Sequence, residues 1–328
     1  MSMTNTDVNT SSPVEVVAEN LLKRIADNLD LVLHGKRGQI ELALVAIVSG
    51  GHLLIDDVPG VGKTLLAKAL ALSLGTDWRR VQFTSDLLPT DVVGVTLFNQ
   101  KTGGFEFRHG PVFSHILLCD EINRAPEKTQ AALLEAMEER AVTVDAVTRN
   151  QPEPFFVLAT QNPIEHRGTY PLPESQLDRF VMRVSLGYPD RNASKLVLDT
   201  DGSDASLTRL RPVATIDEMQ WLIETARKVH VADMLKGFIL DLVDSTRNHP
   251  AVRLGASPRG SLALIRSARA RALMSGRSFV TPDDIQVLAE SVLAHRILLD
   301  PRASRQTDDL TVIREIVRSV PVPVRRSK

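Results

Sequence analysis

The sequence is poor in cysteine and in long hydrophobic runs, and each of these absences excludes a class of protein. Its one cysteine, Cys119, can form neither an internal disulfide nor a thiolate metal cluster, which agrees with a reducing compartment. No apolar run approaches the roughly 18–20 residues that cross a bilayer. The polar N-terminus lacks the apolar core of a signal peptide. We therefore expect a cytoplasmic chain without membrane insertion.

Net charge is also nearly absent, which argues against a protein that mainly coats nucleic acid. The 328 residues include 39 Lys and Arg against 40 Asp and Glu, a formal net charge of -1. Neutralising a phosphate backbone needs a surplus of basic side chains, although a local basic groove remains compatible with these numbers. The composition, 43% hydrophobic and 24% charged, is that of an ordinary folded protein, and the length predicts two domains.

The pattern of apolar residues divides the chain into four parts. Residues 1–13 are polar and predict a mobile tail. Residues 14–198 alternate short apolar strands with helices, which predicts an α/β domain whose parallel sheet is covered on both faces. Residues 199–213 are predicted to be a linker. Residues 214–328 are predicted to form a helical domain with a C-terminal tail, because helix N-cap signals recur at Thr215, Ser257 and Thr281.

The strongest motif is DVPGVGKT, which lies between an apolar strand and an amphipathic helix. In a phosphate-binding loop the backbone N–H groups face the anion, lysine neutralises charge and Ser or Thr ligates Mg²⁺. The alternative is an ordinary turn with an exposed lysine. Asp57 stands where the usual pattern has its first glycine, and aspartate tolerates left-handed backbone better than most residues. The predicted nucleotide-binding residues are Pro59, Gly60, Val61, Gly62, Lys63, Thr64 and Leu65.

Two further apolar strands end in polar residues suited to ATP hydrolysis. HILLCDE delivers Asp120, which can hold Mg²⁺, and Glu121, which can activate water, although an acidic pair here could instead cap a helix. Asn162 follows the strand FFVLAT and can orient the attacking water, or it can belong to an Asn-Pro turn. Cys119 is interpreted as a small buried hydrophobe. Arg179 lies in an LDR triplet that by itself usually means a surface salt bridge.

In their order along the chain, GVGKT, CDEINRAP, ATQNP, LPESQLDRF and ASPRG resemble an AAA+ ATPase. The phrases LLIDDVPGVGKTLLAKALA and FRHGPVFSHILLCDEINRAPEKTQAALLEAMEE resemble the MoxR family more narrowly, and the likeness covers about residues 31–298. It implies a P-loop NTPase sheet between helices, followed by an all-α lid domain.

The resemblance also implies roles for particular residues. Lys63 and Thr64 match the Walker A motif, and Asp120 and Glu121 match Walker B. Asn162 matches sensor 1. Further matches are the arginine finger at Arg179, sensor 2 at Arg259, and the adenine pocket at His34 and Gly35. Arg259 begins a helix and could move onto the γ-phosphate as the lid closes.

The expected ligands are ATP and Mg²⁺, and the expected assembly is a homo-oligomeric ring, most simply a hexamer. The resemblance implies chaperone-like remodelling, maturation or metal-cofactor loading of client proteins, and a partner with a von Willebrand factor A domain. The client itself is not indicated. Residues 86–107 occupy the place of a helix-two insert, and a hairpin with alternating Val142, Val144 and Val147 is predicted before Asn162. Both would project towards a ring centre or a client, or be surface hairpins without a further role.

Other functions are compatible with parts of this sequence pattern. A magnesium-chelatase-like subunit is the closest alternative among relatives, and a DNA-directed AAA+ motor is another. The motor is supported by Arg266, Arg269 and Arg271 and by the pair Arg209 and Arg211, which we interpret as a solvated face of the lid. A nucleotide-controlled scaffold without hydrolysis would not need the full polar set. A GTPase is not expected, because no NKxD-like segment occurs.

Overall fold

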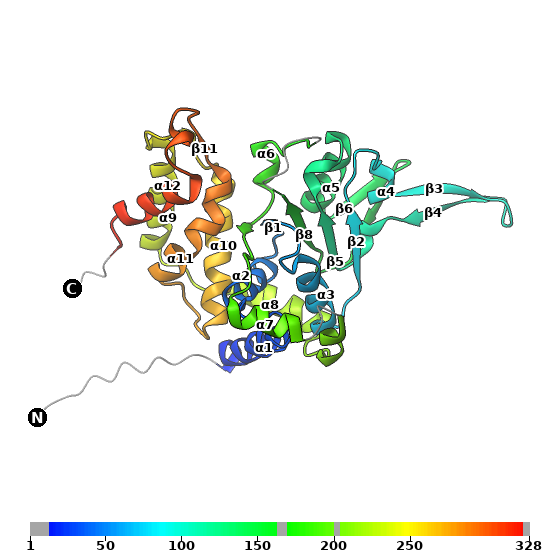
Figure 1. The fold of residues 1–328 in the computed structure, drawn as a ribbon, viewed down its shortest axis with the longest axis horizontal. Helices are drawn as coiled ribbons and strands as arrows, with labels where there is room; N and C mark the ends of the chain where they lie inside the picture. The colour runs from blue at the N-terminus through cyan, green and yellow to red at the C-terminus, as the bar shows by residue number, and fades with distance from the viewer. Residues whose placement is uncertain (1–12, 163–168, 200–203, 324–328) are drawn as a thin grey trace, which may run out of the picture.

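The structure is a computed structural model that describes residues 13–162, 169–199 and 204–323. A sheet domain and a helical domain lie side by side, and a long hairpin extends from the far side of the sheet domain (Figure 1). The predicted tail at residues 1–13 falls outside the described residues up to residue 12, as does the C-terminal tail from residue 324. Pro13 already begins the first helix.

A five-stranded sheet forms the centre of the sheet domain, with the strand order β2-β5-β8-β1-β9. The strands are β1 (Leu53–Asp56), β2 (Trp78–Gln82), β5 (Ile116–Asp120), β8 (Phe156–Gln161) and β9 (Met182–Val184). All neighbouring strands are parallel. The segments that follow β1, β5 and β8 therefore meet at one edge of the sheet, which we call the carboxyl edge.

Successive side chains of the strands alternate between two hydrophobic clusters. Leu53, Ile55 and Leu118 face one cluster, whereas Leu54 and Cys119 face the other. The first cluster includes helices α1 (Pro13–Asp30), α2 (Arg37–Val48) and α3 (Lys63–Ser73), and the second includes α4 (Pro89–Val93) and α5 (Glu127–Glu139). Both faces of the sheet are thus covered by helices, as predicted.

The helical domain is built from five α-helices within the described residues 204–323. They are α8 (Ile216–Lys228), α9 (Asp233–Asn248), α10 (Pro258–Met274), α11 (Pro282–Leu293) and α12 (Asp309–Ser319), with a small pair of strands, β10 (Val252–Leu254) and β11 (Leu298–Leu299). Thr215, Ser257 and Thr281 occupy the N-cap positions of α8, α10 and α11. The predicted helix starts are therefore confirmed.

The two domains share one hydrophobic core. Buried residues of α10, such as Leu264 and Leu273, belong to the same cluster as Leu22 of α1 and Leu44 of α2. A short helix, α6 (Glu174–Leu177), lies between β8 and β9, and the connection between the domains contains α7 (Arg191–Asp199), followed by a 3₁₀ helix at Asp204–Arg209. The helical domain is consequently packed against the sheet domain over a broad apolar contact.

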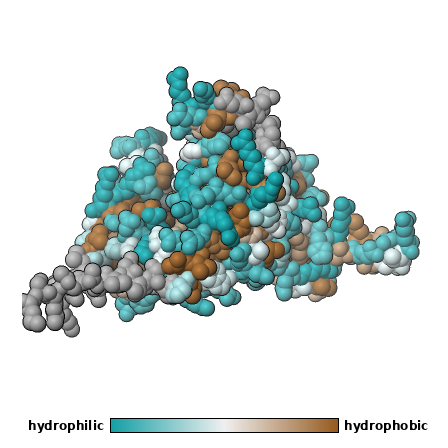
Figure 2. Space-filling view, turned by 90° about the horizontal axis from the view of Figure 1, so that it is seen from below, coloured by the Kyte–Doolittle hydropathy of each residue, from teal (hydrophilic) through white to brown (hydrophobic). Residues whose placement is uncertain are grey.

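Two antiparallel hairpins extend from the sheet domain. The longer one joins β3 (Gly94–Asn99) to β4 (Gly104–His109), and the shorter one joins β6 (Ala141–Val144) to β7 (Val147–Asn150). The longer hairpin forms the arm at the right of Figures 1 and 2, where hydrophobic and hydrophilic residues alternate on its surface. Phe98 and Phe105 are 56% and 77% exposed on this arm. The shorter hairpin was predicted, and the segment at residues 86–107, predicted as an insert, contains the short helix α4 and most of the longer hairpin.

Helices long and apolar enough to cross a membrane are absent from the described part of the chain.

Candidate functional site

The predicted phosphate loop connects the end of β1 to the start of α3 at the carboxyl edge. Gly60 and Gly62 have φ angles of 83° and 100°, a region that favours glycine. Gly62 is also the N-cap of α3, so the loop ends at free N–H groups of an eleven-residue helix. A β-carbon on Gly60 would meet no atom within 4 Å, so the loop is open beside this residue. This arrangement fits a bound phosphate chain.

Asp57 anchors the loop to the chain that follows β9. Its Oδ2 accepts hydrogen bonds from the Ser185 hydroxyl at 3.0 Å and from the Gly187 N–H at 2.6 Å. Its Oδ1 accepts one from the Val58 N–H at 2.8 Å. Asp57 is 7% exposed, and two of these donors come from the chain after β9 while the third lies in the loop. Aspartate at the usual glycine position therefore holds the loop in place.

Lys63 lies at the start of α3 among carboxylates. Its Nζ donates to the Asp57 carbonyl at 2.7 Å. Burial lowers the pKa of Lys63, while Asp57, Asp120 and Glu121 act in the opposite direction and favour the charged form. A half-buried ammonium that faces the carboxyl edge fits the role of neutralising phosphate charge.

Asp120 and Glu121 lie where β5 ends, and neighbouring strands hold both side chains. The Arg80 Nε donates to Asp120 Oδ2 at 2.7 Å, and the Thr160 hydroxyl donates to Asp120 Oδ1 at 3.3 Å. Glu121 Oε2 accepts from the Gln82 Nε2 at 2.9 Å and lies 2.9 Å from the Arg124 Nε. The acidic pair is therefore fixed by β2 and β8, and it does not cap α5, whose N-cap is Pro126.

Glu121 has a left-handed backbone with φ 56° and ψ 51°. This conformation costs a non-glycine residue about 1–2 kcal/mol, and such strained residues cluster at functional sites. The Glu121 N–H compensates by donating to the Thr160 hydroxyl at 2.9 Å. The strain turns the chain sharply, so that Asp120 and Glu121 both remain at the carboxyl edge.

Asn162 follows β8 at the same edge. Gln161 pairs with Asp56 of β1, and Ala159 pairs with Cys119 of β5, so Asn162 comes between the phosphate loop and the acidic pair. It is 6% exposed. Cys119 is fully buried and burial raises the pKa of its thiol, in agreement with its interpretation as a small hydrophobe. The structure thus brings Lys63, Asp120, Glu121 and Asn162 to one edge.

His34 and Gly35 lie in the turn between α1 and α2, and this turn reaches the phosphate loop through residues 185–188. Lys36 Nζ donates to the carbonyls of Leu186, Gly187 and Tyr188 at 2.6, 3.0 and 2.8 Å. The Gly187 N–H in turn binds Asp57. The predicted adenine segment and the phosphate loop are therefore both hydrogen-bonded to the short stretch at residues 185–188.

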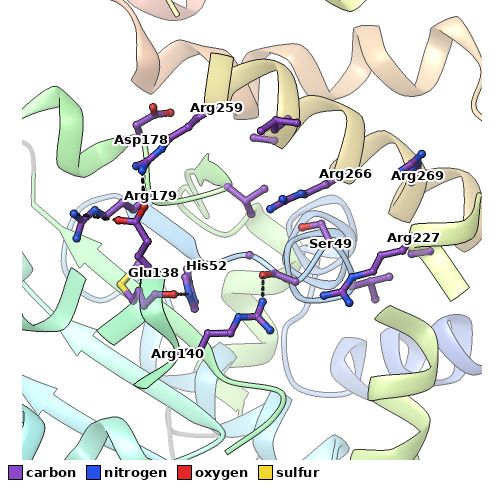
Figure 3. Close-up of a pocket in the computed structure, with 18 of the residues that line it drawn as sticks. Ser49, His52, Glu138, Arg140, Asp178, Arg179, Arg227, Arg259, Arg266 and Arg269 are labelled. Atoms are coloured by element: carbon purple, nitrogen blue, oxygen red, sulfur yellow. Dashed lines mark hydrogen bonds and ion pairs between the residues drawn. The ribbon is translucent and has the colours of Figure 1, made fainter. Parts of the chain in front are cut away.

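Arg179 and Arg259 lie at the opposite edge of the sheet. Both form ion pairs with Glu138 near the end of α5, Arg179 at 3.2 Å (Figure 3). They line a cavity together with Gly51 and His52, which precede β1, and Val181, which precedes β9. Arg179 follows the short helix α6 and is not part of it.

This position corrects one expectation. The phosphate loop follows β1, whereas Arg259 lies beside the residues that precede β1, and a four-residue strand separates the two edges by about 13 Å. In this arrangement Arg259 therefore does not lie where closing of the helical domain would bring it onto the γ-phosphate of its own chain. This position of Arg259 could not be predicted from the sequence, because its partner Glu138 looks like any exposed acid at the end of an amphipathic helix.

The predicted site did not include the residues that hold Asp120 and Glu121. Arg80 and Gln82 lie two positions apart on β2 and therefore on the same face of the sheet. The backbone of Gln82 pairs with Asp120 of β5. The alternation of polar residues in RVQ could have indicated them. The sequence did not indicate the cavity beside the basic residues of α10 either. Arg266 is exposed, as a solvated face predicts, but it also lines the cavity together with the half-buried Arg269, whereas Arg271 faces Asp283 and Asp284.

Comparison with known proteins places this geometry in a family. The family described as "ATPase family associated with various cellular activities (AAA)" matches residues 52–182, and the AAA lid domain matches residues 244–316. Chaperone MoxR1 of Mycobacterium tuberculosis is 37% identical over 92% of this chain and 82% of its own length. The uncharacterized protein YeaC of Bacillus subtilis is 48% identical over 94% of this chain and 96% of its own length.

A solved structure agrees with these relatives. The crystal structure of a protein from Cytophaga hutchinsonii, described as a candidate ATPase, superposes with a TM-score of 0.88 and 36% identity, over 95% of this chain and 97% of that one. The predicted fold, a nucleotide-binding α/β domain followed by a helical lid, is thereby confirmed. The chain belongs to the MoxR family of AAA ATPases.

Proposed function

We propose that this ATPase acts as one subunit of a ring, in which each ATP site is built from two chains. The observation that carries the proposal is the separation of the site residues. Lys63, Asp120 and Glu121 lie at the carboxyl edge, whereas Arg179 and Arg259 lie at the opposite edge on Glu138. A second copy, packed edge against edge, would bring these arginines to the ATP of the first.

The carboxyl edge would bind the nucleotide. The loop from Pro59 to Gly62 and the start of α3 would hold the phosphates by backbone N–H groups, and Lys63 would balance their charge. Thr64 and Asp120 are the residues suited to Mg²⁺, which usually takes one or two protein oxygens together with phosphates and waters. When bound, Mg²⁺ supplies neutralisation of the charge on the phosphates. His34 and Gly35 would contact the base.

Glu121 and Asn162 would handle the attacking water. Glu121 is already held in place by Gln82 and Arg124 and can accept a proton from that water. Asn162 would orient the water without competing for the proton. Arg179 and Arg259 would donate hydrogen bonds to the phosphates in the neighbouring chain, where guanidinium groups stabilise the charge of the transition state.

Hydrolysis would drive chaperone-like remodelling of other proteins in the cytoplasm. A relative that matches most of the chain carries the name chaperone, which supports this class of activity. The finer proposals are a hexameric ring, a partner with a von Willebrand factor A domain, and a client that is matured or loaded with a metal cofactor. The exposed Phe98 and Phe105 on the β3–β4 arm offer apolar surface for such a client.

The test of the site is Glu121→Gln. We expect this variant to bind ATP as the unchanged chain does and to lose turnover by at least about a hundredfold, since it removes the general base. Glu135→Gln, which changes an exposed acid on α5, is the control and should hydrolyse normally. Turnover at the unchanged rate in Glu121→Gln would remove Glu121 from the mechanism. Proteins that copurify with the inactive, ATP-bound ring would identify the client.

A further inference from the structure

A cavity of about 750 Å³ lies between the sheet domain and the helical domain, and the proposed hydrolysis uses only its rim. Its walls come from the start of β1, the end of α5, and helices α8 and α10 (Figure 3). The volume falls within the range of small-molecule sites. It opens at the edge of the sheet opposite the phosphate loop.

Arginine dominates the lining of this cavity. The arginines are Arg140, Arg179, Arg227, Arg259, Arg266, Arg269 and Arg296, and the acids are Glu138 and Asp178. Both acids are already paired, because Glu138 binds Arg179 and Arg259, and Asp178 binds Arg296 at 2.7 Å. We call the remaining four, Arg140, Arg227, Arg266 and Arg269, the arginine quartet. Within the described residues no carboxylate pairs with any of them.

The quartet consists of two pairs that line the same cavity. A β-carbon on Gly50 would lie 3.5 Å from Arg140 Nη2 and 3.9 Å from Arg227 Nη2, so both guanidinium groups surround the same point. Arg140 donates to the Gly50 carbonyl at 3.1 Å. Arg266 and Arg269 are three residues apart and therefore share one side of α10. The Nε of Arg269 is buried without a hydrogen-bond acceptor.

Such an arrangement has an electrostatic cost that a ligand would remove. Like charges that converge in a hollow repel one another, and solvent screens this repulsion only in part at the exposed Arg140, Arg227 and Arg266. Guanidinium groups present planar pairs of donors that match the oxygens of phosphate. We propose that the arginine quartet binds a compact, multiply charged anion with phosphoryl groups, at a site separate from the phosphate loop of the same chain.

Pyrophosphate is the probe for this site, and Lys63→Ala is the background that removes phosphate binding at the loop. We expect calorimetry without Mg²⁺ to show one pyrophosphate per chain. In Arg266→Ala/Arg269→Ala the affinity should fall by about tenfold or more, because two charge-assisted hydrogen-bond donors are lost. Arg253→Ala removes an exposed arginine that does not line the cavity, and it should leave the affinity unchanged.

A second variant tests whether the planar guanidinium groups matter beyond their charge. Arg266→Lys/Arg269→Lys keeps the charges but loses the planar donors, and it should bind with intermediate affinity. Two results would overturn the proposal: equal loss in Arg253→Ala, or no binding of pyrophosphate, including the case in which single-stranded DNA binds in its place. That case would make the quartet part of a nucleic-acid surface. Because none of these measurements uses hydrolysis, their outcome is independent of the ATPase proposal.

Discussion

Asp57 occupies a glycine position in the phosphate loop, and its carboxylate makes three hydrogen bonds there. Removing it would leave the N–H of Gly187 and the hydroxyl of Ser185 without their acceptor. We expect Asp57→Ala to lower the free energy of unfolding by about 2 kcal/mol or more. Urea denaturation measures this. Asp57→Asn keeps one acceptor oxygen and should fall between the two, whereas a change below about 0.5 kcal/mol in Asp57→Ala would refute the anchoring role.

His52 is a buried histidine that connects α5 to β8. Its Nδ1 accepts from the Val157 N–H at 3.1 Å, and its Nε2 lies 3.3 Å from the Met137 carbonyl, which requires the neutral ring. Burial, together with the charge of Arg140, lowers its pKa to about 4, while the hydrogen bond to the Met137 carbonyl acts in the opposite direction. The unfolded chain therefore binds a proton more readily between pH 6.5 and 4. Stability from His52 is complete above pH 6.5 and is lost as pH falls through 4.

This difference can be measured with His52→Gln. Between pH 7 and pH 4.5 the unchanged chain should lose about 2–3 kcal/mol more unfolding free energy than the variant, because only the unchanged chain must keep His52 neutral. His295, whose pKa burial also lowers, is common to both proteins and cancels in the comparison. Equal losses in the two proteins would show that His52 does not contribute to acid unfolding.

At the scale of elements, the β3–β4 arm is separate from the core. Phe98 and Phe105 contact each other at 5.4 Å between ring centroids, but both are exposed. We expect Phe98→Ser/Phe105→Ser to change the free energy of unfolding by less than about 1 kcal/mol. Phe83→Ala, in the buried core, is the contrasting variant and should cost about 3–5 kcal/mol. A large loss from the arm variant would mean that the arm stabilises the fold.

The joint between the domains depends on Arg296, which is 5% exposed. It donates from Nε to Asp178 Oδ1 at 2.7 Å and from Nη2 to the Phe180 carbonyl at 2.6 Å. Arg296→Met should destabilise the protein by about 3–5 kcal/mol, because it leaves Asp178 charged and unpaired. Arg302→Met on the exposed surface is the control. Calorimetric unfolding should show a large shift for the first variant and almost none for the second.

Elements were predictable where local chemistry determines them. The sheet strands read as short apolar runs, and Thr215 with Glu218 closes the capping box that its spacing indicates. The residues at the carboxyl edge were predictable too, since parallel strands bring their ends together. The position of α10 was not, because it depends on packing against α1 and α2 across more than two hundred residues of sequence. Arg259, Glu138 and the arginine quartet follow from that packing, so no local pattern contains them.

At the scale of the whole molecule, the proposed division of the site between chains can be tested by mixing. Lys63→Ala and Arg179→Ala should each be inactive in hydrolysis. In an equal mixture, roughly a quarter of the contacts between neighbours would combine an intact loop with an intact arginine, so activity should return in part. An ATPase assay on the mixture measures this. Activity in Arg179→Ala alone, or none in the mixture, would contradict a site shared between chains.

Glu138 is a single carboxylate that holds one arginine from each domain. In the proposed ring, the phosphates of a neighbouring chain would compete with Glu138 for both arginines at once. Each ATP that binds would thus weaken the ion pairs of Glu138 that connect the sheet domain and the helical domain of the next chain. Because such coupling is reciprocal, the helical domain of one subunit would set the nucleotide affinity of its neighbour, and ATP binding around the ring would be cooperative.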